Sequence, residues 1–442
     1  MAARHPPFDD PAAVVAPAVA ALTPSTQSLQ ALIGAFRRAI ARGLAGEPSS
    51  LKMLSTFVEQ PRGDECGRVA VVDWGGTHGR AALVELIGAE GTRTLAEREF
   101  VFRESDKSGS AEDIFGEIAG AVEAAVGREG PLPLGFVYSF PARLDGIDRA
   151  VALSLTKGWR VRGLVGQDVV ALLRSALARR GLDRVAVTAV ANDTVSTLVL
   201  ESYRRRARDP GARPADIGLI LGTGANQAAD LPGAGVRNLE SGNFDGVEGV
   251  ASSWDRALDS EVTDPAPGAQ RFEKMTAGHY LGEILRRALL DPGGRAPIFR
   301  TPPAALRAPW SLDAEHVSAF ARDGSDQLSA TAKTLRALDI PSTDAERRAL
   351  CALARAVGRR TARLIAAGLL GTATFIDPEL RADRVVAVDG SVYGGFPGFP
   401  DLVREAFGEL AGSTAAERLS VVYAKDSTAA GAAVIAAVAA RR

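Results

Sequence analysis

The sequence is poor in cysteine and has almost no net charge, and each shortage excludes a class of protein. Cys66 and Cys351 are the only two cysteines in 442 residues. Two thiols cannot build a disulfide framework or a cysteine-rich metal site, which favours a cytoplasmic protein with reduced thiols. The 52 Lys and Arg residues nearly balance the 53 Asp and Glu residues, so the net charge is -1. We therefore expect neither nucleic acid nor a membrane as a partner.

The sequence also lacks an apolar run long enough to cross a membrane. An Ala- and Val-rich stretch at residues 12–22 is too short to span a bilayer. Asp9 and Asp10 precede it, where a secretory signal needs positive charge. We interpret this stretch as an irregular lead-in to an amphipathic helix around residues 28–42.

Three common catalytic motifs are missing as well. The chain contains no Walker A sequence, no HExxH zinc motif and no CxxC pair, so any phosphate site must use a different loop. The composition, with 46% hydrophobic and 24% charged residues, is nevertheless that of an ordinary globular protein. The length corresponds to roughly two to three domains.

Strand-like and helix-like segments alternate along the chain, which predicts an α/β fold. Apolar runs at residues 69–72 and 80–86 flank a glycine-rich turn and predict a β-hairpin. Residues 217–221 and 227–229 repeat this pattern, which indicates two related lobes that face one another. Further strands are predicted at residues 134–138, 185–190 and 384–389, and helices at residues 163–178, 195–203, 259–306 with polar breaks, 345–370 and 429–440.

The first glycine-rich turn has the parts of a phosphate site. Gly75 and Gly76 let the backbone approach a charged ligand and direct N–H groups at its oxygens. Thr77 adds a hydroxyl donor and Arg80 a cation, and Asp73 is suited to hold a hydrated Mg²⁺. A plain hairpin turn would explain the same residues.

Two later features are weaker when each is taken alone. The turn Gly222-Thr223-Gly224 is a second phosphate loop only if it faces the first one across a cleft. Asp193 stands where a predicted strand ends and a helix begins. A carboxylate there suits a catalytic base, but Asp is also favoured as a helix N-cap, so position alone does not separate the two roles.

Taken in order, these segments resemble the hexokinase family of two-lobed, actin-like sugar kinases, as a single-unit chain of the bacterial type. The resemblance runs from about residue 51 to residue 433, with residues 290–380 poorly covered. The matching segments are Lys52-Met53-Leu54-Ser55-Thr56-Phe57-Val58, Asp73-Trp74-Gly75-Gly76-Thr77-His78-Gly79-Arg80, Ser139-Phe140-Pro141, Thr156-Lys157-Gly158, Ala191-Asn192-Asp193-Thr194-Val195, residues 221–226, Asn238-Leu239-Glu240, Phe272-Glu273-Lys274-Met275 and Val388-Asp389-Gly390-Ser391-Val392-Tyr393. The ordered set is far more specific than any one match.

The resemblance implies a ribonuclease H-like fold of two α/β lobes with a cleft between them. We expect a small lobe of residues 63–190 and 426–442, and a large lobe of residues 1–62 and 191–425. The implied reaction transfers the γ-phosphate of ATP to the 6-hydroxyl of a hexose, with glucose the first candidate, as the first step of glycolysis. The alternatives are another hexose such as fructose or mannose, an amino sugar, or a sugar-sensing protein with little turnover.

The resemblance also implies roles for individual residues. Asp193 is expected to accept the proton of the sugar 6-hydroxyl, and Lys157 to steady charge near the reacting oxygen. The residues expected to hydrogen-bond the sugar are Ser139, Thr156, Lys157, Asn192, Asp193, Asn226, Glu240 and Glu273. Those expected at the nucleotide are Asp73, Gly75, Gly76, Thr77, Arg80, Gly222, Thr223, Gly224, Gly390 and Ser391, with Mg²⁺ held by Asp73 through water. The lobes are expected to close over the sugar and so exclude water.

The chain departs from the family pattern at several positions. His78 and Gly79 stand where the first phosphate loop usually has Asn and Phe, and Ala225 replaces a Thr in the second. Near the C-terminus, Asp426-Ser427-Thr428-Ala429-Ala430-Gly431 replaces Asp-Gly-Ser-Gly-Lys-Gly. These departures bear on nucleotide affinity and sugar choice, but they leave Asp193 in place.

Overall fold

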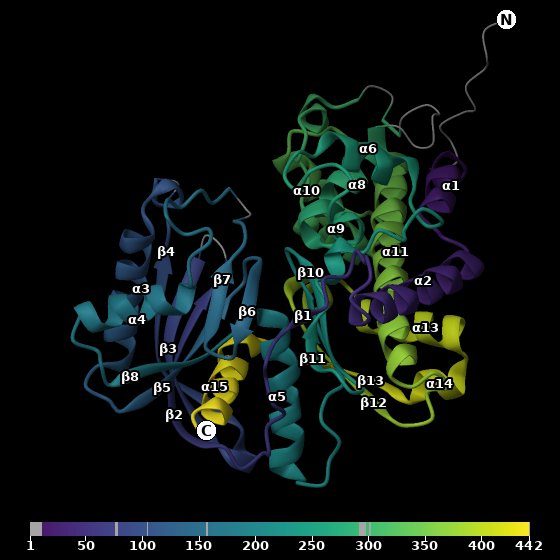
Figure 1. Ribbon diagram of the computed structural model, residues 1–442. Helices are drawn as coiled ribbons and strands as arrows, with labels where there is room; N and C mark the ends of the chain where they lie inside the picture. The colour runs from purple at the N-terminus through teal and green to yellow at the C-terminus, as the bar shows by residue number, and fades with distance from the viewer. Residues whose placement is uncertain are drawn as a thin grey trace, which may run out of the picture.

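The computed structural model describes residues 11–75, 78–103, 105–155, 158–290, 298–299 and 302–441, without the side chains of Pro11, Ala12 and His78. Figure 1 shows two α/β lobes, each built around its own β-sheet. This arrangement confirms the predicted two-lobed α/β fold. Among the described residues, every helix is too short or too polar to cross a bilayer.

The small lobe contains a mixed sheet formed by β2 (Cys66–Trp74), β3 (His78–Ile87), β4 (Thr92–Val101), β5 (Leu132–Tyr138) and β8 (Val185–Ala191). The strands lie in the order β4-β3-β2-β5-β8. β2 and β3 pair antiparallel through the first glycine-rich turn, as predicted, whereas β2, β5 and β8 run parallel. The short strands β6 (Ala142–Gly146) and β7 (Arg149–Ala152) form a separate hairpin.

Helices cover both faces of this sheet, which explains why β2 is apolar along most of its length. Its alternate residues Val72 and Trp74 share a core with α3 (Ala111–Val126) and α4 (Val169–Arg179). Val69 and Val71 instead share a core with α5 (Asp193–Arg208) and α15 (Ser427–Ala439). The last helix of the chain therefore lies against strands formed by its first half, as Figure 1 shows.

The large lobe contains a second mixed sheet in the order β1-β11-β10-β9-β12-β13. Its strands are β1 (Leu54–Ser55), β9 (Ile217–Leu221), β10 (Ala225–Leu231), β11 (Gly235–Asn238), β12 (Arg384–Asp389) and β13 (Leu419–Tyr423). Its helices are α1 (Pro11–Ala21), α2 (Thr26–Leu44), α6 (Ser253–Glu261), α7 (Arg271–Thr276), α8 (Gly278–Leu290), α9 (Ala314–Arg322), α10 (Ser329–Ala337), α11 (Asp344–Ile376), α12 (Ser391–Gly395), α13 (Phe399–Ala411) and α14 (Ser413–Glu417).

Helix α5 joins the two lobes. It packs against α15 on one side and against β9, β10 and β12 on the other. A Cβ atom added to Gly431 of α15 would lie 2.0 Å from the Ser196 carbonyl oxygen of α5, so the two helices cross with backbone nearly in contact. The N-terminal end of α5 is thereby held at the junction of the lobes.

Two sequence predictions for helices were wrong. Residues 12–22 are not an irregular lead-in, because α1 occupies Pro11–Ala21 and buries Val15 and Ala18 in a core shared with α11. The stretch is apolar on all sides and so lacks helical periodicity, although Ala is the best helix former. The helix predicted from residue 163 begins at Val169 instead, because Gly163 and Gly166 have φ angles of 72° and 83° and Asp168 provides the N-cap.

Candidate active site

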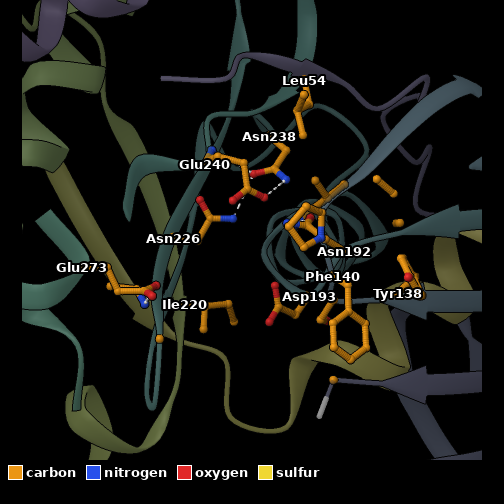
Figure 2. Close-up of a pocket in the computed structure, with 18 of the residues that line it drawn as sticks. Leu54, Tyr138, Phe140, Asn192, Asp193, Ile220, Asn226, Asn238, Glu240 and Glu273 are labelled. Atoms are coloured by element: carbon orange, nitrogen blue, oxygen red, sulfur yellow. Dashed lines mark hydrogen bonds between the residues drawn. The ribbon is translucent and has the colours of Figure 1, made fainter. Parts of the chain in front are cut away.

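A cleft of about 780 Å³ is lined by residues from both lobes. The predicted site residues that line it are Gly75, Ser139, Asn192, Asp193, Thr223, Gly224, Asn226, Glu240 and Glu273. Figure 2 shows the Asp193 carboxylate between the large-lobe side chains and the Phe140 segment of the small lobe. Asp73, Arg80, Gly222, Gly390 and Ser391 are not among the lining residues. Gly76, Thr77, Thr156 and Lys157 lie outside the described residues.

Asp193 begins helix α5, but it is not the cap of that helix. The Asn192 side-chain oxygen accepts a hydrogen bond from the Val195 backbone N–H at 3.0 Å, so Asn192 is the N-cap. The Asp193 carboxylate accepts from the Thr194 backbone N–H at 2.7 Å and from the Thr194 hydroxyl at 3.1 Å, both through Oδ1. The alternative in which Asp193 is the N-cap is therefore wrong, and no hydrogen bond joins its Oδ2 atom to another described residue.

Three polar side chains from β10, β11 and the segment after β11 are linked by hydrogen bonds (Figure 2). The Asn226 amide nitrogen donates to Asn238 Oδ1 at 2.9 Å, and the Asn238 amide nitrogen donates to Glu240 Oε1 at 2.7 Å. The Ser241 backbone N–H donates to Asn226 Oδ1 at 3.0 Å. Both the amide of Asn226 and the carboxylate of Glu240 are therefore oriented by the protein itself.

Glu273 reaches the same wall of the cleft from helix α7. Its Oε2 atom accepts from the Ala225 backbone N–H at 3.0 Å, at the point where the second glycine-rich turn enters β10. A Cβ atom added to Gly224 would lie 3.1 Å from that oxygen, so a side chain there would press on the carboxylate. The close approach explains why this position of the turn suits glycine.

The small-lobe wall of the cleft is backed by aromatic rings. Trp74 packs against Phe102, Phe115, Tyr138, Phe140 and Trp159 at centroid distances of 5.3 to 6.0 Å. The Ser139 backbone N–H donates to the Trp74 carbonyl at 3.2 Å, but the buried Ser139 hydroxyl has no hydrogen-bond partner among the described residues. Burial raises the pKa of the Tyr138 phenol, so this ring remains neutral at physiological pH.

At the first glycine-rich turn, Asp73 and Arg80 are cross-strand partners in the β2–β3 pair. Their side chains form an ion pair at 3.4 Å, and Arg80 also lies 3.7 Å from the Glu97 carboxylate. Asp73 Oδ1 is 3.9 Å from the position that a Cβ atom would take on Gly75. The Asp73 carboxylate therefore lies close to Gly75, and Gly75 lines the cleft.

The Asp73 carboxylate has the chemistry of a ligand for a hydrated Mg²⁺ ion. The described residues contain no cluster of three or more His, Cys, Asp or Glu side chains that could hold a metal. Mg²⁺ does not need such a cluster, because it keeps several waters and is commonly bound by one or two carboxylates together with substrate phosphates. Asp73 beside Gly75 provides a carboxylate of that kind.

The residues predicted for the nucleotide in the large lobe form a contiguous backbone surface. A Cβ atom on Gly222 would lie 3.4 Å from the Ser391 backbone nitrogen, and one on Gly390 would lie 2.3 Å from the Leu221 carbonyl oxygen. Gly390 also has a φ angle of 124°, which favours glycine. The second glycine-rich turn and the start of α12 therefore lie close together, with no room for a side chain at Gly390.

Sequence reasoning missed several residues of the cleft, namely Thr56, Asn238, Asp264, Gln270, His279 and Tyr280. His279 lies beside the second glycine-rich turn, because its backbone N–H donates to the Thr223 carbonyl at 3.2 Å. Its imidazole stacks on the Trp310 indole at a centroid distance of 4.9 Å. Burial lowers the pKa of His279, so the ring is neutral at pH 7. These contacts join segments far apart in the chain, and no local motif signals them.

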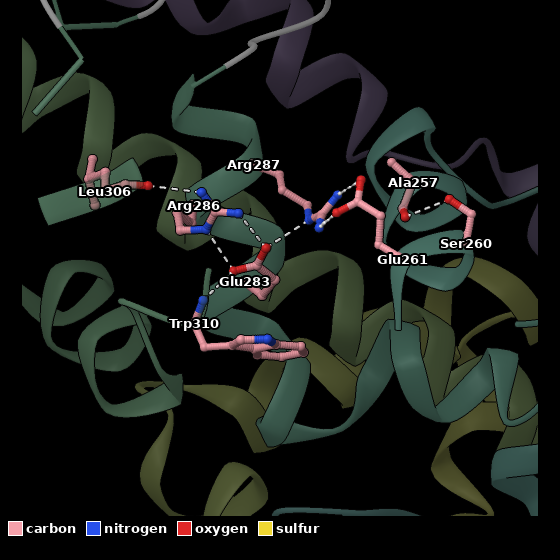
Figure 3. A network of polar contacts seen from close by, with 8 residues as sticks. All are labelled: Ala257, Ser260, Glu261, Glu283, Arg286, Arg287, Leu306 and Trp310. Atoms are coloured by element: carbon pink, nitrogen blue, oxygen red, sulfur yellow. Dashed lines mark hydrogen bonds and ion pairs between the residues drawn. The ribbon is translucent and has the colours of Figure 1, made fainter. Parts of the chain in front are cut away.

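A network of charges anchors α8 and Trp310 (Figure 3). The fully buried Glu283 carboxylate accepts from Arg286 at 2.5 and 2.7 Å, from Arg287 at 2.9 Å and from the Trp310 backbone N–H at 2.9 Å. Burial alone would raise the pKa of Glu283, but these hydrogen bonds and the two guanidinium charges hold it below its ordinary value. The network holds the Trp310 backbone against α8, and the Trp310 indole stacks on His279 in the first turn of that helix.

Comparison with known proteins gives a consistent match. Two protein-family models, both described as hexokinase, match residues 216–438 and residues 15–203. Hexokinase-7 of Oryza sativa subsp. japonica is 35% identical over 94% of this chain and 94% of its own length. Hexokinase-2 of Candida albicans is 32% identical over 95% of this chain and 90% of its own length.

A comparison with solved structures gives the same family. The hexokinase of Schistosoma mansoni, complexed with glucose, superposes with a TM-score of 0.79 at 27% identity and covers 98% of each chain. The three relatives come from a plant, a yeast and an animal, so they do not support the bacterial type expected from the sequence.

Proposed function

The chain belongs to the hexokinase family and phosphorylates a hexose with ATP, and we propose that Asp193 is the general base of this reaction. In the proposal, the Asp193 carboxylate accepts the proton of the sugar 6-hydroxyl as that oxygen attacks the γ-phosphate. The observation that carries the proposal is that Asp193 lines the cleft and that its Oδ2 atom makes no hydrogen bond to a described residue. The helix N-terminus beneath it favours a negative charge at that position.

The sugar is proposed to lie between Asp193 and the large-lobe wall. Asn226, Glu240 and Glu273 are oriented by the protein and line the same cleft, which supports their role as sugar ligands. The Ser139 hydroxyl, which has no partner within the part of the chain that the structure describes, supports a contact from the other lobe. A buried polar group without a partner costs about 1–3 kcal/mol, and a sugar hydroxyl would remove this cost. Asn192, which also lines the cleft, belongs to the proposed set, and Thr156 and Lys157 complete it by resemblance alone.

The nucleotide is proposed to bind between the two glycine-rich turns. Asp73, Gly75, Gly76, Thr77 and Arg80 would face it from the small lobe, and Gly222, Thr223, Gly224, Gly390 and Ser391 from the large lobe. Support comes from the position of Gly75, Thr223 and Gly224 along one cleft. Mg²⁺, when bound beside Asp73, would neutralise charge on the phosphates.

Three further proposals concern the setting of the reaction. Glucose is proposed as the preferred hexose, because the related Schistosoma mansoni structure is a glucose complex. The lobes are proposed to divide at residues 63–190 with 426–442 and residues 1–62 with 191–425, and to close over the sugar. The protein is proposed to act in the first step of glycolysis. A cytoplasmic location is proposed because its two cysteines are too few for a disulfide framework.

A coupled assay of ADP release with a panel of hexoses tests the proposed activity. We expect glucose to stimulate ADP release with Mg²⁺ present, and fructose, mannose and glucosamine to rank behind it. Sugar binding without sugar-stimulated ADP release would instead indicate a sensor and would contradict the proposed activity.

A further inference from the structure

Asn238 lies at the centre of the polar wall of the cleft, and no role follows for it from the sequence. It is the last residue of β11, is 7% exposed and lines the cleft. It pairs with Ala228 of β10, two residues after Asn226, so Asn226 and Asn238 are diagonal neighbours on one face of the sheet. Diagonal neighbours are within reach of long polar side chains, which explains the 2.9 Å bond between them.

The Asn238 amide makes hydrogen bonds with both of its polar atoms. Its oxygen accepts from the Asn226 side chain at 2.9 Å and from the Glu240 backbone N–H at 3.1 Å. Its nitrogen donates to the Glu240 carboxylate at 2.7 Å. An amide provides both functions at any pH, whereas an ionised carboxylate could not donate to Glu240 and an ammonium could not accept from Asn226.

The hydrogen bond from the Glu240 backbone N–H to Asn238 stabilises an uncommon backbone conformation. Glu240 has φ and ψ angles of 51° and 51°, a left-handed conformation that non-glycine residues seldom adopt. Asn side chains stabilise such turns by accepting from the backbone N–H two residues further on. Asn238 therefore holds both the backbone and the carboxylate of Glu240.

From this geometry we infer that Asn238 is a positioning residue that sets the donor and acceptor pattern presented to the sugar. Its acceptor oxygen forces the Asn226 nitrogen toward Asn238 and so fixes the orientation of the Asn226 amide. Its donor nitrogen fixes the position of Glu240 Oε1, which accepts this hydrogen bond. The inference rests on the proposed function, since it requires a sugar at Asn226 and Glu240.

The substitution Asn238→Asp tests this role with almost no change in shape. It removes the donor to Glu240 and puts a second carboxylate at the 2.7 Å position, where two like charges cannot both ionise easily. The other carboxylates that line the cleft are Asp193 from α5, Asp264, and Glu273 from α7. We expect the sugar KM at pH 8 to rise roughly tenfold to hundredfold, while the KM for ATP stays within about threefold.

The pH dependence separates positioning from mere loss of structure. As the pH falls, the two adjacent carboxylates share one proton, which restores a donor toward Glu240. The ratio of sugar KM between variant and wild type should therefore decrease by at least about fivefold from pH 8 to pH 6. A purely structural defect would leave this ratio independent of pH.

Two further variants complete the experiment. Asn243→Asp is the matched control, because the one hydrogen bond of the Asn243 side chain to a described residue goes to the Glu240 backbone carbonyl, at 3.3 Å. We expect no pH-dependent change in sugar KM for this variant. Asn238→Ser adds no charge and should raise the sugar KM at every pH, which covers the case in which Asn238→Asp does not fold. An unchanged sugar KM in both Asn238 variants, or an equal effect of Asn243→Asp, would overturn the inference. Failure of the wild type to release ADP with any hexose would instead contradict the proposed function.

Discussion

The two walls of the cleft are built in different ways. On the large-lobe wall, Asn226, Asn238, Glu240 and Glu273 are tied to one another or to the backbone by hydrogen bonds of 2.7 to 3.0 Å. On the small-lobe wall, the buried polar atoms of Trp74, Tyr138, Ser139 and Trp159 have no hydrogen-bond partner within the described part of the chain. These side chains are held by the packing of aromatic rings instead.

This difference indicates where recognition is prepared in advance. Polar groups that are already hydrogen-bonded lose little freedom when a sugar binds, so the large-lobe wall is preorganised. The Ser139 hydroxyl has no hydrogen-bond partner among the described residues, so a bound sugar could provide one. We therefore expect substitutions on the large-lobe wall to affect both stability and sugar binding, and the Ser139 substitution to affect sugar binding alone.

The largest expected effect is on Asp193, which lies between the two walls. Asp193→Ala should lower kcat by roughly 10²- to 10⁴-fold, because the general base is lost, while sugar affinity stays within about tenfold. Steady-state kinetics and calorimetric titration with glucose measure the two quantities. Joint loss of sugar binding and of the thermal unfolding transition would point to a structural role and contradict the base assignment.

The Glu283 network, which anchors α8 and Trp310, should contribute strongly to stability. Glu283→Gln leaves Arg286 and Arg287 without their buried counter-ion and should lower the free energy of unfolding by about 3–5 kcal/mol. The control Glu261→Gln, at a side chain that is 62% exposed, should cost less than about 1 kcal/mol. Urea denaturation measures the free energy of unfolding of both variants. Equal losses would contradict the expectation that the buried ion pairs contribute more than the exposed one.

The same carboxylate gives a pH prediction with a defined sign. The pKa of Glu283 is held below its ordinary value of 4.5, so its contribution to stability is complete above pH 4.5. The contribution disappears as the pH falls through the lowered pKa of the folded state. The difference in unfolding free energy between wild type and Glu283→Gln should therefore shrink below pH 4.5. A difference that stays constant down to the acid transition would contradict this assignment.

The aromatic packing behind the small-lobe wall can be tested at Phe100, whose ring packs on Phe102. Gly79 and Phe100 are cross-strand partners, and a Cβ atom on Gly79 would lie 2.1 Å from the Phe100 ring. Phe100 thus occupies the space beside the position at which the family usually has Phe. Phe100→Ala should destabilise the protein by about 3 kcal/mol, and adding Gly79→Phe should recover part of this loss. Additive destabilisation by the two changes would show that the rings do not replace one another.

The smallest expected effect is at Ser139. Ser139→Ala should raise the sugar KM by about five- to tenfold, which corresponds to one hydrogen bond. Its unfolding free energy should stay within about 0.5 kcal/mol of the wild type, because the hydroxyl has no described partner to lose. Kinetics with glucose and thermal unfolding measure both, and a clear loss of stability would remove the contrast between the walls.

Local sequence signals predicted the elements that carry the glycine-rich turns. The strands at residues 217–221 and 384–389 were predicted at their observed bounds, because short apolar runs end in glycine. Helix α1 was missed, since an Ala- and Val-rich segment has no polar face to reveal a helical period. Helix α5 begins two residues earlier than predicted, because Asn192 caps it.

Non-local contacts limited what could be predicted for the site. Asn238 acquires its place from the register of β10 and β11, and Trp310 from the distant Glu283 anchor. Neither relationship leaves a fixed spacing in the sequence. The residues that were predicted belong instead to short segments whose backbone conformation and chemistry are contained within a few positions, such as Gly222-Thr223-Gly224.

A crystal structure of the wild-type protein with bound glucose would test the central claim most directly. The distance from the Asp193 carboxylate to the sugar 6-hydroxyl oxygen should be about 2.6–3.2 Å, the range that proton transfer requires. A primary hydroxyl beyond the reach of that carboxylate, even through one water molecule, would contradict Asp193 as the base.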